Sequence, residues 1–470
     1  MLKLDKNAKM PVYLQIYQQL KDQIISGELR PNERLKATRV LSEEYHLSRN
    51  TVLSAYQQLE SEGFVRSLVG SGFYVEDLPE YRGNRPAEIS AYPEENKQKE
   101  CTYDFRYGNI EPNVYRSRSF RKALRDAMEE LGKRENLQDD DHRGIFGLRE
   151  AICEHLREVR GMNASPDQII ITSGHHYSIS LLQKLIPAQN RTLLIEDPGH
   201  RDSRTVFEEE GYRICPIPLD DNGIIVEKIL PYQGSVAYVT PSHQFPLGMI
   251  LPIARRLQLL KWAKESGSYV IEDDYDSELR YREQPVDALF SLDENGRIIY
   301  LGSFSKSLSP DLRVSYIVLP RSFPLSSVYG HLPSSSTSLL IQMTLENYLR
   351  SGEYRKRIAR MRNLLRKKHA LIVDTLRDRY KDSIGIFGIG GGTHFVLKLP
   401  VQKSQDEIIA FFRERDIAVY PTEEFSYRKS GNDPSILIGY SGIPLDRLKE
   451  YLERFLQTLD ELIQTERKTD

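Results

Sequence analysis

The segment 300–316, YLGSFSKSLSPDLRVSY, places a lysine after an apolar run. Lys306 follows this run, and Ser303 and Ser305 precede it in the same loop. Arg313 comes seven residues after the lysine. A lysine amine can condense with an aldehyde to form a Schiff base, and arginine and hydroxyl groups bind phosphate. The segment therefore predicts a Schiff base between Lys306 and the aldehyde of pyridoxal phosphate (PLP), beside groups able to hold the phosphate.

PLP bound to a lysine needs further groups, and the sequence offers candidates for each. A carboxylate must keep the pyridine nitrogen protonated, and a donor must bond the ring phenolate. Asp273 and Tyr275 follow the apolar run in VIEDDYDSE. Each signal alone is weak, since an acidic strand end is usually solvated or caps a helix and Ser-x-Ser-Lys is common in loops. Their order along the chain favours the PLP site. The predicted phosphate cradle, in TSGHHYSISLL, consists of Ser173, Gly174, His175 and His176.

From residue 103 onward, short apolar strands alternate with longer helical segments. This alternation is typical of an α/β fold with a mostly parallel sheet and helices on both faces. Ligands of such folds bind beyond the carboxyl ends of the strands, where the candidate residues lie. Residues 338–380 are predicted to be mostly helical. A smaller α+β lobe is predicted over about 355–470, so it includes the end of this helical stretch. The predicted strands are Gln168–Thr172, Thr192–Glu196, Ser235–Thr240, Ser268–Glu272, Arg297–Gly302 and Arg313–Leu319.

The N-terminal residues show another pattern, three helices followed by a hairpin. Apolar residues recur at helix spacing over 11–26, and further helices are predicted over 37–45 and after Ser48, which can cap the third helix. The hairpin turns at 70–72. This order is typical of a winged helix-turn-helix, whose recognition helix lays its first residues in the major groove of DNA. The predicted DNA contacts are Arg39, Ser48, Arg49, Asn50, Thr51, Gly70, Ser71 and Gly72.

Charge does not decide the role of this module. The chain has a formal net charge of −2, so no overall field draws it to nucleic acid or to a membrane. Across 30–52, basic and acidic residues nearly cancel, and a strongly basic footprint is missing. On the residues alone, a small helical protein-interaction domain therefore stays an alternative to DNA binding.

A length of 470 residues is too long for one core and predicts several domains. We expect a DNA-binding domain over 1–76, a linker over the charged, proline-containing 77–102, and a PLP-binding domain over 103–470. The 3 cysteines show neither a disulfide framework nor metal-ligand spacing, so no metal is expected. The charged N-terminus and the lack of a long apolar run predict a soluble cytoplasmic protein without membrane spans.

Two family resemblances extend this interpretation. RLKATRVLSEEYHLSRNTVLSAYQQLESEGFV resembles the winged helix of GntR-type regulators, with Lys36-Ala37 where that family has Pro-Ser. Residues 103–460 resemble fold-type I (class I) aminotransferases. That resemblance implies Asp273 at the pyridinium, Tyr275 at the phenolate oxygen, and phosphate held by Ser303 and Arg313. It also aligns TPSHQFPLG, which contains His243 and Phe245, with the segment that lies along the cofactor ring.

A GntR winged helix joined to an aminotransferase-like domain is the arrangement of the MocR/GabR-type transcription regulators. PSHQFPLGMILPIARR, IEDDYDSE and GSFSKSLSPDLRVSY resemble the motifs of that subfamily. The resemblance implies a regulator that binds operator DNA as a head-to-tail homodimer. An amino-compound effector would then be sensed by aldimine exchange at Lys306 and would alter operator binding or promoter activation. The alternatives are a genuine aminotransferase with an accessory DNA-binding domain, and a scaffold without cofactor.

The sequence departs from aminotransferases where they bind substrate. Leu437, in SILIGYSG, stands where those enzymes have an arginine that clamps the substrate carboxylate, so efficient transamination is not expected. His200 could stack on the cofactor ring, and Arg201 could either meet a ligand or pair with a nearby acid. If Asp202 and Glu424 approach the pocket, they would favour a ligand with an extra amine over a dicarboxylate.

Overall fold

The computed structural model describes residues 2–6, 8–78, 100–111, 113–135, 141–187, 189–280, 287–324, 332, 337–428, 431 and 433–467. The chain divides into two compact units, Met1–Gln98 and Lys99–Asp470. Most of the predicted linker, 79–99, lies outside the described residues.

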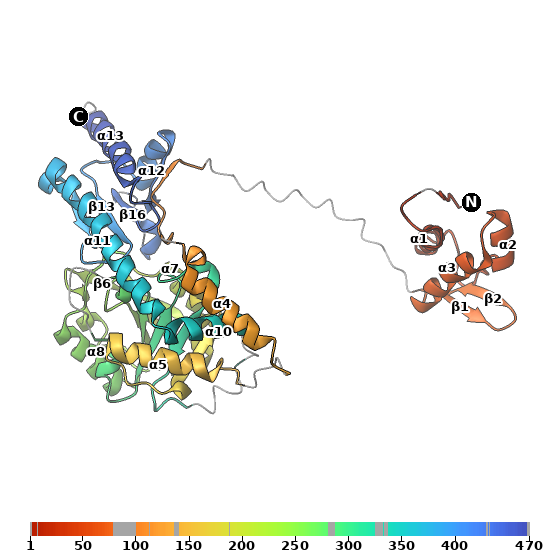
Figure 1. Cartoon of the computed structure of the whole chain (residues 1–470), viewed down its shortest axis with the longest axis horizontal. Helices are drawn as coiled ribbons and strands as arrows, with labels where there is room; N and C mark the ends of the chain where they lie inside the picture. Colours follow the sequence, from red (N-terminus) through yellow and green to blue (C-terminus); the bar gives the residue numbers. More distant parts are fainter. Residues whose placement is uncertain are drawn as a thin grey trace. The chain divides into compact units, whose positions relative to one another are not determined.

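The N-terminal unit has the predicted three helices and hairpin (Figure 1). Val52, Ala55 and Leu59 lie on one face of the third helix and are completely buried, together with Ile16 of the first helix. Ser48 caps the third helix as predicted, because its side chain accepts a hydrogen bond from the Thr51 amide. The elements are α1 (Val12–Ile25), α2 (Thr38–Glu44), α3 (Arg49–Ser61), β1 (Val65–Leu68) and β2 (Gly72–Val75).

The wing is the antiparallel pair β1 and β2, with Val65 opposite Val75 and Leu68 opposite Gly72. Gly70 and Gly72 have φ angles of 76° and 115°, which side chains with a Cβ rarely adopt. The glycines at these positions therefore allow the tight turn that the sequence predicted.

The larger unit contains an eight-stranded sheet in the order β4-β11-β10-β9-β8-β5-β6-β7. Neighbouring strands are parallel except around β11, which is antiparallel to both β10 and β4, and at β7. The six predicted strands are confirmed within one or two residues, whereas β6 and β7 were not predicted. The strands are β4 (Ile169–Thr172), β5 (Thr192–Asp197), β6 (Arg213–Asp220), β7 (Gly223–Ile224), β8 (Val236–Val239), β9 (Tyr269–Asp274), β10 (Ile298–Ser303) and β11 (Ser315–Val318).

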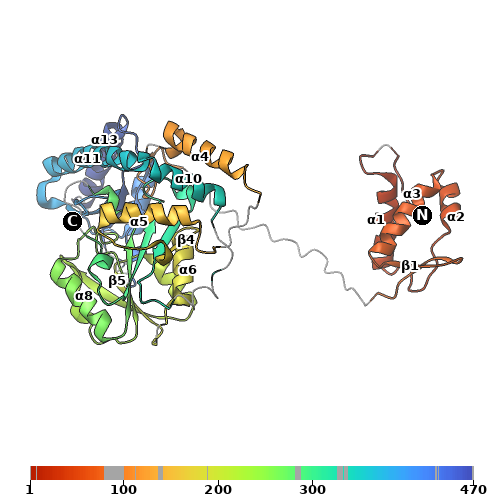
Figure 2. The same ribbon diagram turned by 60° about the horizontal axis from the view of Figure 1, so that its bottom comes forward.

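Helices cover both faces of this sheet (Figures 1 and 2). In β5, Leu193 and Ile195 pack into the core beneath α6 and α7, whereas Leu194 packs on the opposite face against α8. Both faces are therefore buried, which explains the nearly continuous apolar strands. The helices of the sheet layer are α5 (Phe146–Arg160), α6 (His175–Leu185), α7 (Arg201–Glu209) and α8 (Ile253–Glu265).

A smaller lobe is built on the four-stranded sheet β12-β13-β16-β15. The segment Tyr103–Asp104 (β3) also belongs here, because it pairs with β14. Apolar side chains of this lobe and of α5 join one continuous core. The remaining elements are α4 (Arg118–Leu131), α10 (Leu339–Arg350), α11 (Glu353–Tyr380), β12 (Gly385–Phe387), β13 (His394–Lys398), α12 (Gln405–Glu414), β14 (Ile417–Ala418), β15 (Tyr420–Pro421), β16 (Ser435–Gly439) and α13 (Leu448–Arg467).

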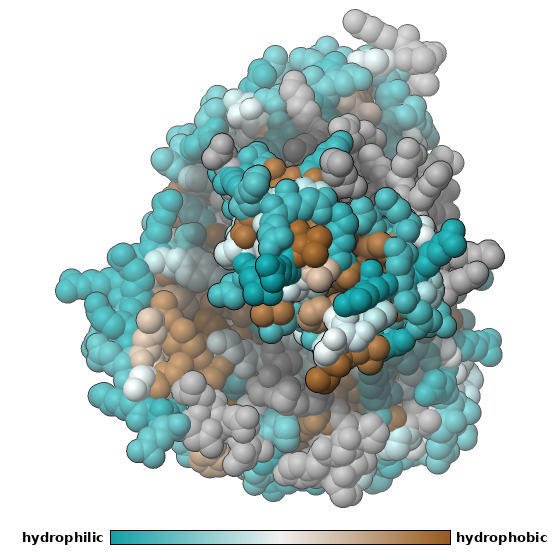
Figure 3. Space-filling model, turned by 90° about the vertical axis from the view of Figure 1, so that its right-hand side faces the viewer, coloured by the Kyte–Doolittle hydropathy of each residue, from teal (hydrophilic) through white to brown (hydrophobic). Residues whose placement is uncertain are grey.

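The surface in Figure 3 is largely hydrophilic, with apolar side chains in separate patches. Within the described residues, no helix is long and apolar enough to cross a membrane.

The buried face of α3 gives a test of the N-terminal fold. Replacing Leu59, which is completely buried, with alanine should destabilise this unit by about 2–5 kcal/mol because it leaves a cavity. Leu53 lies on the same helix but is 36% exposed, so Leu53→Ala should change stability by less than about 1 kcal/mol. Hydrogen exchange of the α1 and α3 amides in the full chain measures both. Equal protection in the two variants would contradict this packing.

Candidate functional site

The sheet brings the predicted cofactor residues to one edge. The parallel strands β4, β5, β8, β9 and β10 all end there, and β11 begins there because it runs in the opposite direction. The pairing register places Ser303 opposite Ser315, and Ser315 opposite Thr172. Three segments therefore meet at this edge, although they are separate in the sequence. They are the loop that carries Lys306, the start of the cradle at Ser173, and the segment that begins at Arg313.

Lys306 is partly buried in the loop that follows β10. Its Nζ lies 3.7 Å from the centroid of the Tyr107 ring, whose face attracts a cation. Burial lowers the pKa of Lys306 to about 8, while Asp276 and Asp273 oppose the shift. A substantial fraction of the amine is thus neutral near physiological pH, which Schiff-base formation requires.

Asp273, at the end of β9, belongs to a buried hydrogen-bonded chain. The Tyr238 hydroxyl donates to Asp273 Oδ2 at 2.5 Å and lies 3.1 Å from His175 Nε2. The same histidine nitrogen is 3.7 Å from Asp273 Oδ2. Burial raises the pKa of Asp273 to about 6, and His200 opposes the shift. A cationic partner would stabilise the carboxylate in this setting, as a protonated pyridine nitrogen does.

Tyr275 lies in a second polar chain on the same edge. Its hydroxyl is 3.0 Å from His243 Nδ1, and the same nitrogen is 3.0 Å from Asp276 Oδ1. The His243 and Tyr275 rings also stack, with centroids 5.9 Å apart. His243, predicted to touch the cofactor, therefore orients the hydroxyl of Tyr275 and connects it to a buried carboxylate.

The phosphate cradle combines a glycine turn, hydroxyls and a helix N-terminus. Gly174 precedes α6 with a φ of 100°, and a Cβ there would lie 3.0 Å from the Arg313 guanidinium. The Ser305 amide donates to Ser303 Oγ at 3.1 Å, and the Ser315 hydroxyl lies 3.2 Å from it. Arg313 remains exposed, and Ser173 is partly buried. This donor set fits a phosphate group.

The two cradle histidines lie differently. His175 is partly buried and its ring packs edge-on against His200, with centroids 4.9 Å apart. Burial lowers the pKa of both His175 and His200 to about 4, although the nearby Asp202 carboxylate raises both values. His176 is exposed on α6, so its side chain does not join the buried group.

Phe245 is buried among aromatic rings beside the lysine. Its ring centroid lies 4.8 to 5.8 Å from the centroids of five other rings. These rings are Tyr107, His200, Tyr275, His394 and Phe425. Burial holds the pKa of His394 well below its usual range, so its ring is neutral. These rings form an aromatic cluster that reaches Lys306 through Tyr107.

Leu437 is 2% exposed on β16, opposite Val396 and Tyr420 in the two neighbouring strands. Ile436 and Ile438 point into the main core, so Leu437 lies on the other face of the strand. An aliphatic side chain here offers no charge to a carboxylate.

The predicted effector residues Arg201 and Glu424 form an ion pair. Arg201 Nη1 lies 2.9 Å from Glu424 Oε2, joining the start of α7 to the smaller lobe. The sequence left open whether Arg201 meets a ligand or pairs with a nearby acid, and in this structure it pairs with an acid. Asp202 is exposed in the first turn of α7, and His200 caps that helix by accepting from the Ser203 amide.

The predicted DNA contacts divide into exposed and internally bonded groups. Arg49 and Asn50 are exposed at the start of α3. The Ser48 and Thr51 hydroxyls lie 2.8 Å apart and bond each other. Arg39 is exposed and pairs with Glu43 at 3.0 Å. Arg49 and Asn50 are therefore the side chains best placed to reach base edges, and the Gly70-Ser71-Gly72 turn forms the wing tip.

Several residues of the site were not predicted from the sequence. Tyr107 and Tyr238 lie far from the motifs in the sequence, so only the fold brings them to Lys306 and Asp273. Asp276 stands in VIEDDYDSE three residues after Asp273, and that spacing could have marked it. The residues missed are Tyr107, Tyr238, Asp276, His394 and Phe425.

Two family models match this chain along most of its length. Bacterial regulatory proteins, gntR family, matches residues 12–75, and Aminotransferase class I and II matches residues 109–455. The chain is 34% identical over 460 residues to the uncharacterized HTH-type transcriptional regulator YdeL of Bacillus subtilis (strain 168), covering 96% of this chain and 97% of YdeL. It is 28% identical over 476 residues to MocR of Rhizobium meliloti, covering 96% and 94%. The chain belongs to the MocR/GabR-type subfamily of GntR-family regulators.

The larger unit of this MocR/GabR-type chain is also similar to solved aminotransferases. Kynurenine aminotransferase from Pyrococcus horikoshii, solved in complex with PMP, matches with a TM-score of 0.66 and 25% identity, covering 76% of this chain and 91% of that one. The α/β fold is thus a fold-type I aminotransferase domain joined to a GntR winged helix. The winged helix indicates a DNA-binding regulator, and the aminotransferase domain implies dependence on PLP.

The buried setting of Lys306 predicts an unusual pH dependence. Its amine should become reactive as the pH rises through about 8, below the ordinary lysine value of 10.5, because burial disfavours the charged form. Trace acetylation of the PLP-free protein, followed by peptide mass spectrometry, measures the midpoint. Asp276→Asn should lower that midpoint further, because the Asp276 carboxylate stabilises the charged amine of Lys306 and the substitution removes it. A wild-type midpoint near 10 would contradict this environment.

Proposed function

We propose that this MocR/GabR-type protein is a PLP-dependent transcription regulator that senses an amino compound at Lys306 and responds by changing its binding to operator DNA or its activation of a promoter. The observation that carries the proposal is the convergence of Lys306, Asp273 and Arg313 at one sheet edge, in a chain that also contains a GntR winged helix. The sensing step rests on the chemistry of this site.

The residues at the sheet edge fit PLP in charge and position. Asp273 would face the pyridine nitrogen, and Tyr275, oriented by His243, would donate to the phenolate oxygen. The phosphate would lie on the N-terminus of α6, held by Arg313 and by hydroxyls of the β10 loop. When bound, PLP supplies an aldehyde carbon that an amine can attack.

The chain's own residues then explain how an amine could displace the lysine. Lys306 would be released as a neutral amine, and its pKa near 8 means that this amine would take up a proton close to neutral pH. Once released, its ammonium form would be stabilised by the face of Tyr107 and by the carboxylate of Asp276. Release of Lys306 would change the contacts around its loop. This change can alter DNA binding only if the protein with Lys306 attached to PLP and the protein with Lys306 released differ in their affinity for DNA.

The aromatic cluster and Leu437 favour an effector other than an ordinary dicarboxylate amino acid. Phe245 and its neighbours present uncharged rings beside Lys306, and Leu437 replaces a carboxylate clamp. Asp202 and Glu424 would supply negative charge for a second amine, although Glu424 must first leave Arg201. Tight binding of a simple dicarboxylate amino acid would contradict this preference.

We further propose a head-to-tail homodimer that presents two winged helices to two operator half-sites. Closed twofold dimers are the commonest protein assemblies, and paired recognition helices match paired half-sites.

Bound PLP should give the purified protein a yellow visible absorption band. Lys306→Ala should lack this band because the Schiff base cannot form, whereas Lys264→Ala, a change of an exposed lysine on α8, should keep it. Adding the correct amine should shift the band and change operator affinity in the same concentration range. A wild-type protein that stays colourless after PLP is added would refute the cofactor role.

Arg49 should contribute strongly to operator binding. Its exposed side chain at the start of α3 can donate two hydrogen bonds to a guanine, so Arg49→Ala should weaken binding by about 1–3 kcal/mol, roughly 5- to 150-fold. Arg321→Ala, a change of an exposed arginine in the larger unit, is the matched control. Fluorescence anisotropy on an operator selected from random DNA measures both. Equal affinities of the two variants would contradict the assignment of α3 as recognition helix.

A genuine aminotransferase is the second candidate, favoured by the complete Lys306, Asp273, Tyr275 and Arg313 set. Leu437 opposes it, because nothing at that position can hold a substrate carboxylate. Rapid conversion of bound PLP to its amine form by ordinary amino acids would favour the enzyme over the sensor.

A further inference from the structure

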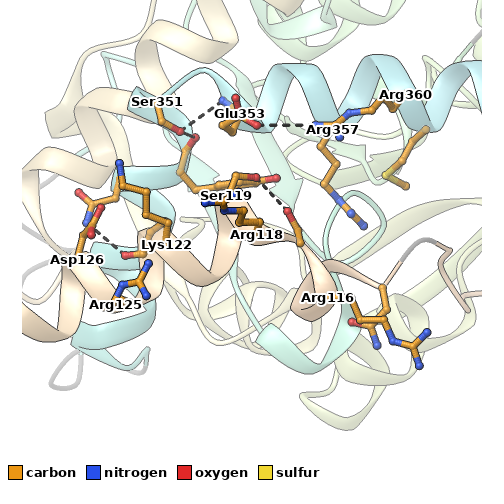
Figure 4. Close-up of a pocket in the computed structure, with 16 residues that line it drawn as sticks. Arg116, Arg118, Ser119, Lys122, Arg125, Asp126, Ser351, Glu353, Arg357 and Arg360 are labelled. Atoms are coloured by element: carbon orange, nitrogen blue, oxygen red, sulfur yellow. Dashed lines mark hydrogen bonds and ion pairs between the residues drawn. The ribbon is translucent and has the colours of Figure 1, made fainter.

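A hollow of about 860 Å³ lies between α4 and the start of α11, and neither Lys306 nor Arg313 is among the residues that line it. Figure 4 shows side chains from both helices bordering it. Its walls carry six basic and two acidic side chains, a formal excess of four positive charges in a chain whose net charge is −2. The basic residues are Arg116, Arg118, Lys122, Arg125, Arg357 and Arg360.

Four of these cations, those of α4 and the turn before it, are exposed. Within the described part of the chain, Arg116, Arg118, Lys122 and Arg125 form no ion pair. The excess of four positive charges already counts both acids. Glu353 contacts Arg360, one of the six basic residues, at 3.8 Å, and it contacts Lys356, which lies outside the lining, at 2.7 Å. The hollow therefore holds a positive potential that a bound anion would relieve.

Arg357 gives this hollow a fixed cation. It is 5% exposed, and its Nε donates to the Ser307 carbonyl at 2.9 Å. Tyr354, one turn earlier on α11, donates to the Ser307 hydroxyl at 2.9 Å. Ser307 directly follows Lys306, so the inner wall of the hollow is bonded to the loop of the cofactor lysine. Burial lowers the pKa of Arg357, and the nearby Arg360 cation lowers it further.

Two helix N-termini add to this field. Ser117 caps α4, and Gly352 precedes α11, so the positive ends of both helix dipoles lie in the lining. Serine hydroxyls at 117, 119 and 351 also lie in the lining, where Ser117 and Ser119 bond each other and Ser351 donates to the Tyr348 carbonyl.

We propose that this hollow binds a small phosphate-bearing polyanion with at least two phosphate groups. Arginine matches phosphate in geometry as well as charge, and several arginines together suit a polyphosphate better than one carboxylate. The volume lies within the range of small-ligand pockets, which favours a compact ligand over a nucleic acid. This site is separate from the cradle of Arg313 and Gly174, and the proposal goes beyond the sensing function.

Isothermal titration of the full-length, PLP-free protein with inorganic pyrophosphate tests the site. Binding should weaken at least about tenfold in the double variant Arg118→Ala/Lys122→Ala, whose exposed side chains are not needed for folding, and should weaken further in Arg118→Glu/Lys122→Glu. Arg357→Lys should also weaken it, because lysine keeps the charge but loses the fork geometry. The matched control Lys264→Glu/Lys449→Glu removes two exposed cations elsewhere and should bind as the wild type does.

Arg313→Ala separates this site from the cofactor cradle, because pyrophosphate binding in the hollow should survive that change. Three results would overturn the proposal: no binding of pyrophosphate at millimolar concentration, loss of binding in Arg313→Ala instead of the α4 variants, or equal weakening in the control. A fourth would be operator DNA binding that depends on Arg118 and Lys122 without any pyrophosphate binding, which would assign the hollow to nucleic acid. None of these results depends on whether Lys306 binds PLP.

Discussion

The balance of charge around one recessed amine governs the larger unit. Lys306 loses hydration beside Tyr107, and the carboxylates of Asp273 and Asp276 oppose the resulting fall in its pKa. Those carboxylates are themselves buried and need partners, which Tyr238 and His243 provide. The site is thus one coupled group of charges and hydrogen bonds, in which a cationic ring nitrogen would stabilise the Asp273 carboxylate.

The sheet makes this arrangement possible. Parallel strands deliver their following loops to one edge, and the reversal at β11 returns Arg313 to the same edge. Residues separated by more than a hundred positions therefore meet without long loops. The winged helix needs no such convergence, because the residues that we propose contact the bases are consecutive at the start of α3. For this reason, the candidate DNA contacts can be found in one short stretch of sequence, whereas the candidate cofactor site has to be assembled from several distant motifs.

The features that could be predicted from the sequence are those determined by residues close together in the chain. Ser48 caps α3, the apolar runs form the strands, and Asp273 and Lys306 follow strand ends. The sequence could not predict contacts that depend on lobe packing, such as Tyr107 beneath Lys306, and it left open whether Arg201 pairs with an acid, without identifying Glu424 as the partner. His176 shows a related limit, since a cradle motif fixes the backbone but not which of two histidines points inward. β6 was missed because prolines interrupt its apolar pattern.

We propose that Lys306 holds PLP and releases it to an amine. Borohydride reduction of the PLP-loaded protein, followed by peptide mass spectrometry, tests this directly because reduction fixes the Schiff base in place. We expect a phosphopyridoxyl group on the peptide that contains Lys306, and its loss when the effector amine is added before reduction. Modification of another lysine, or an unmodified Lys306 peptide at saturating PLP, would contradict it.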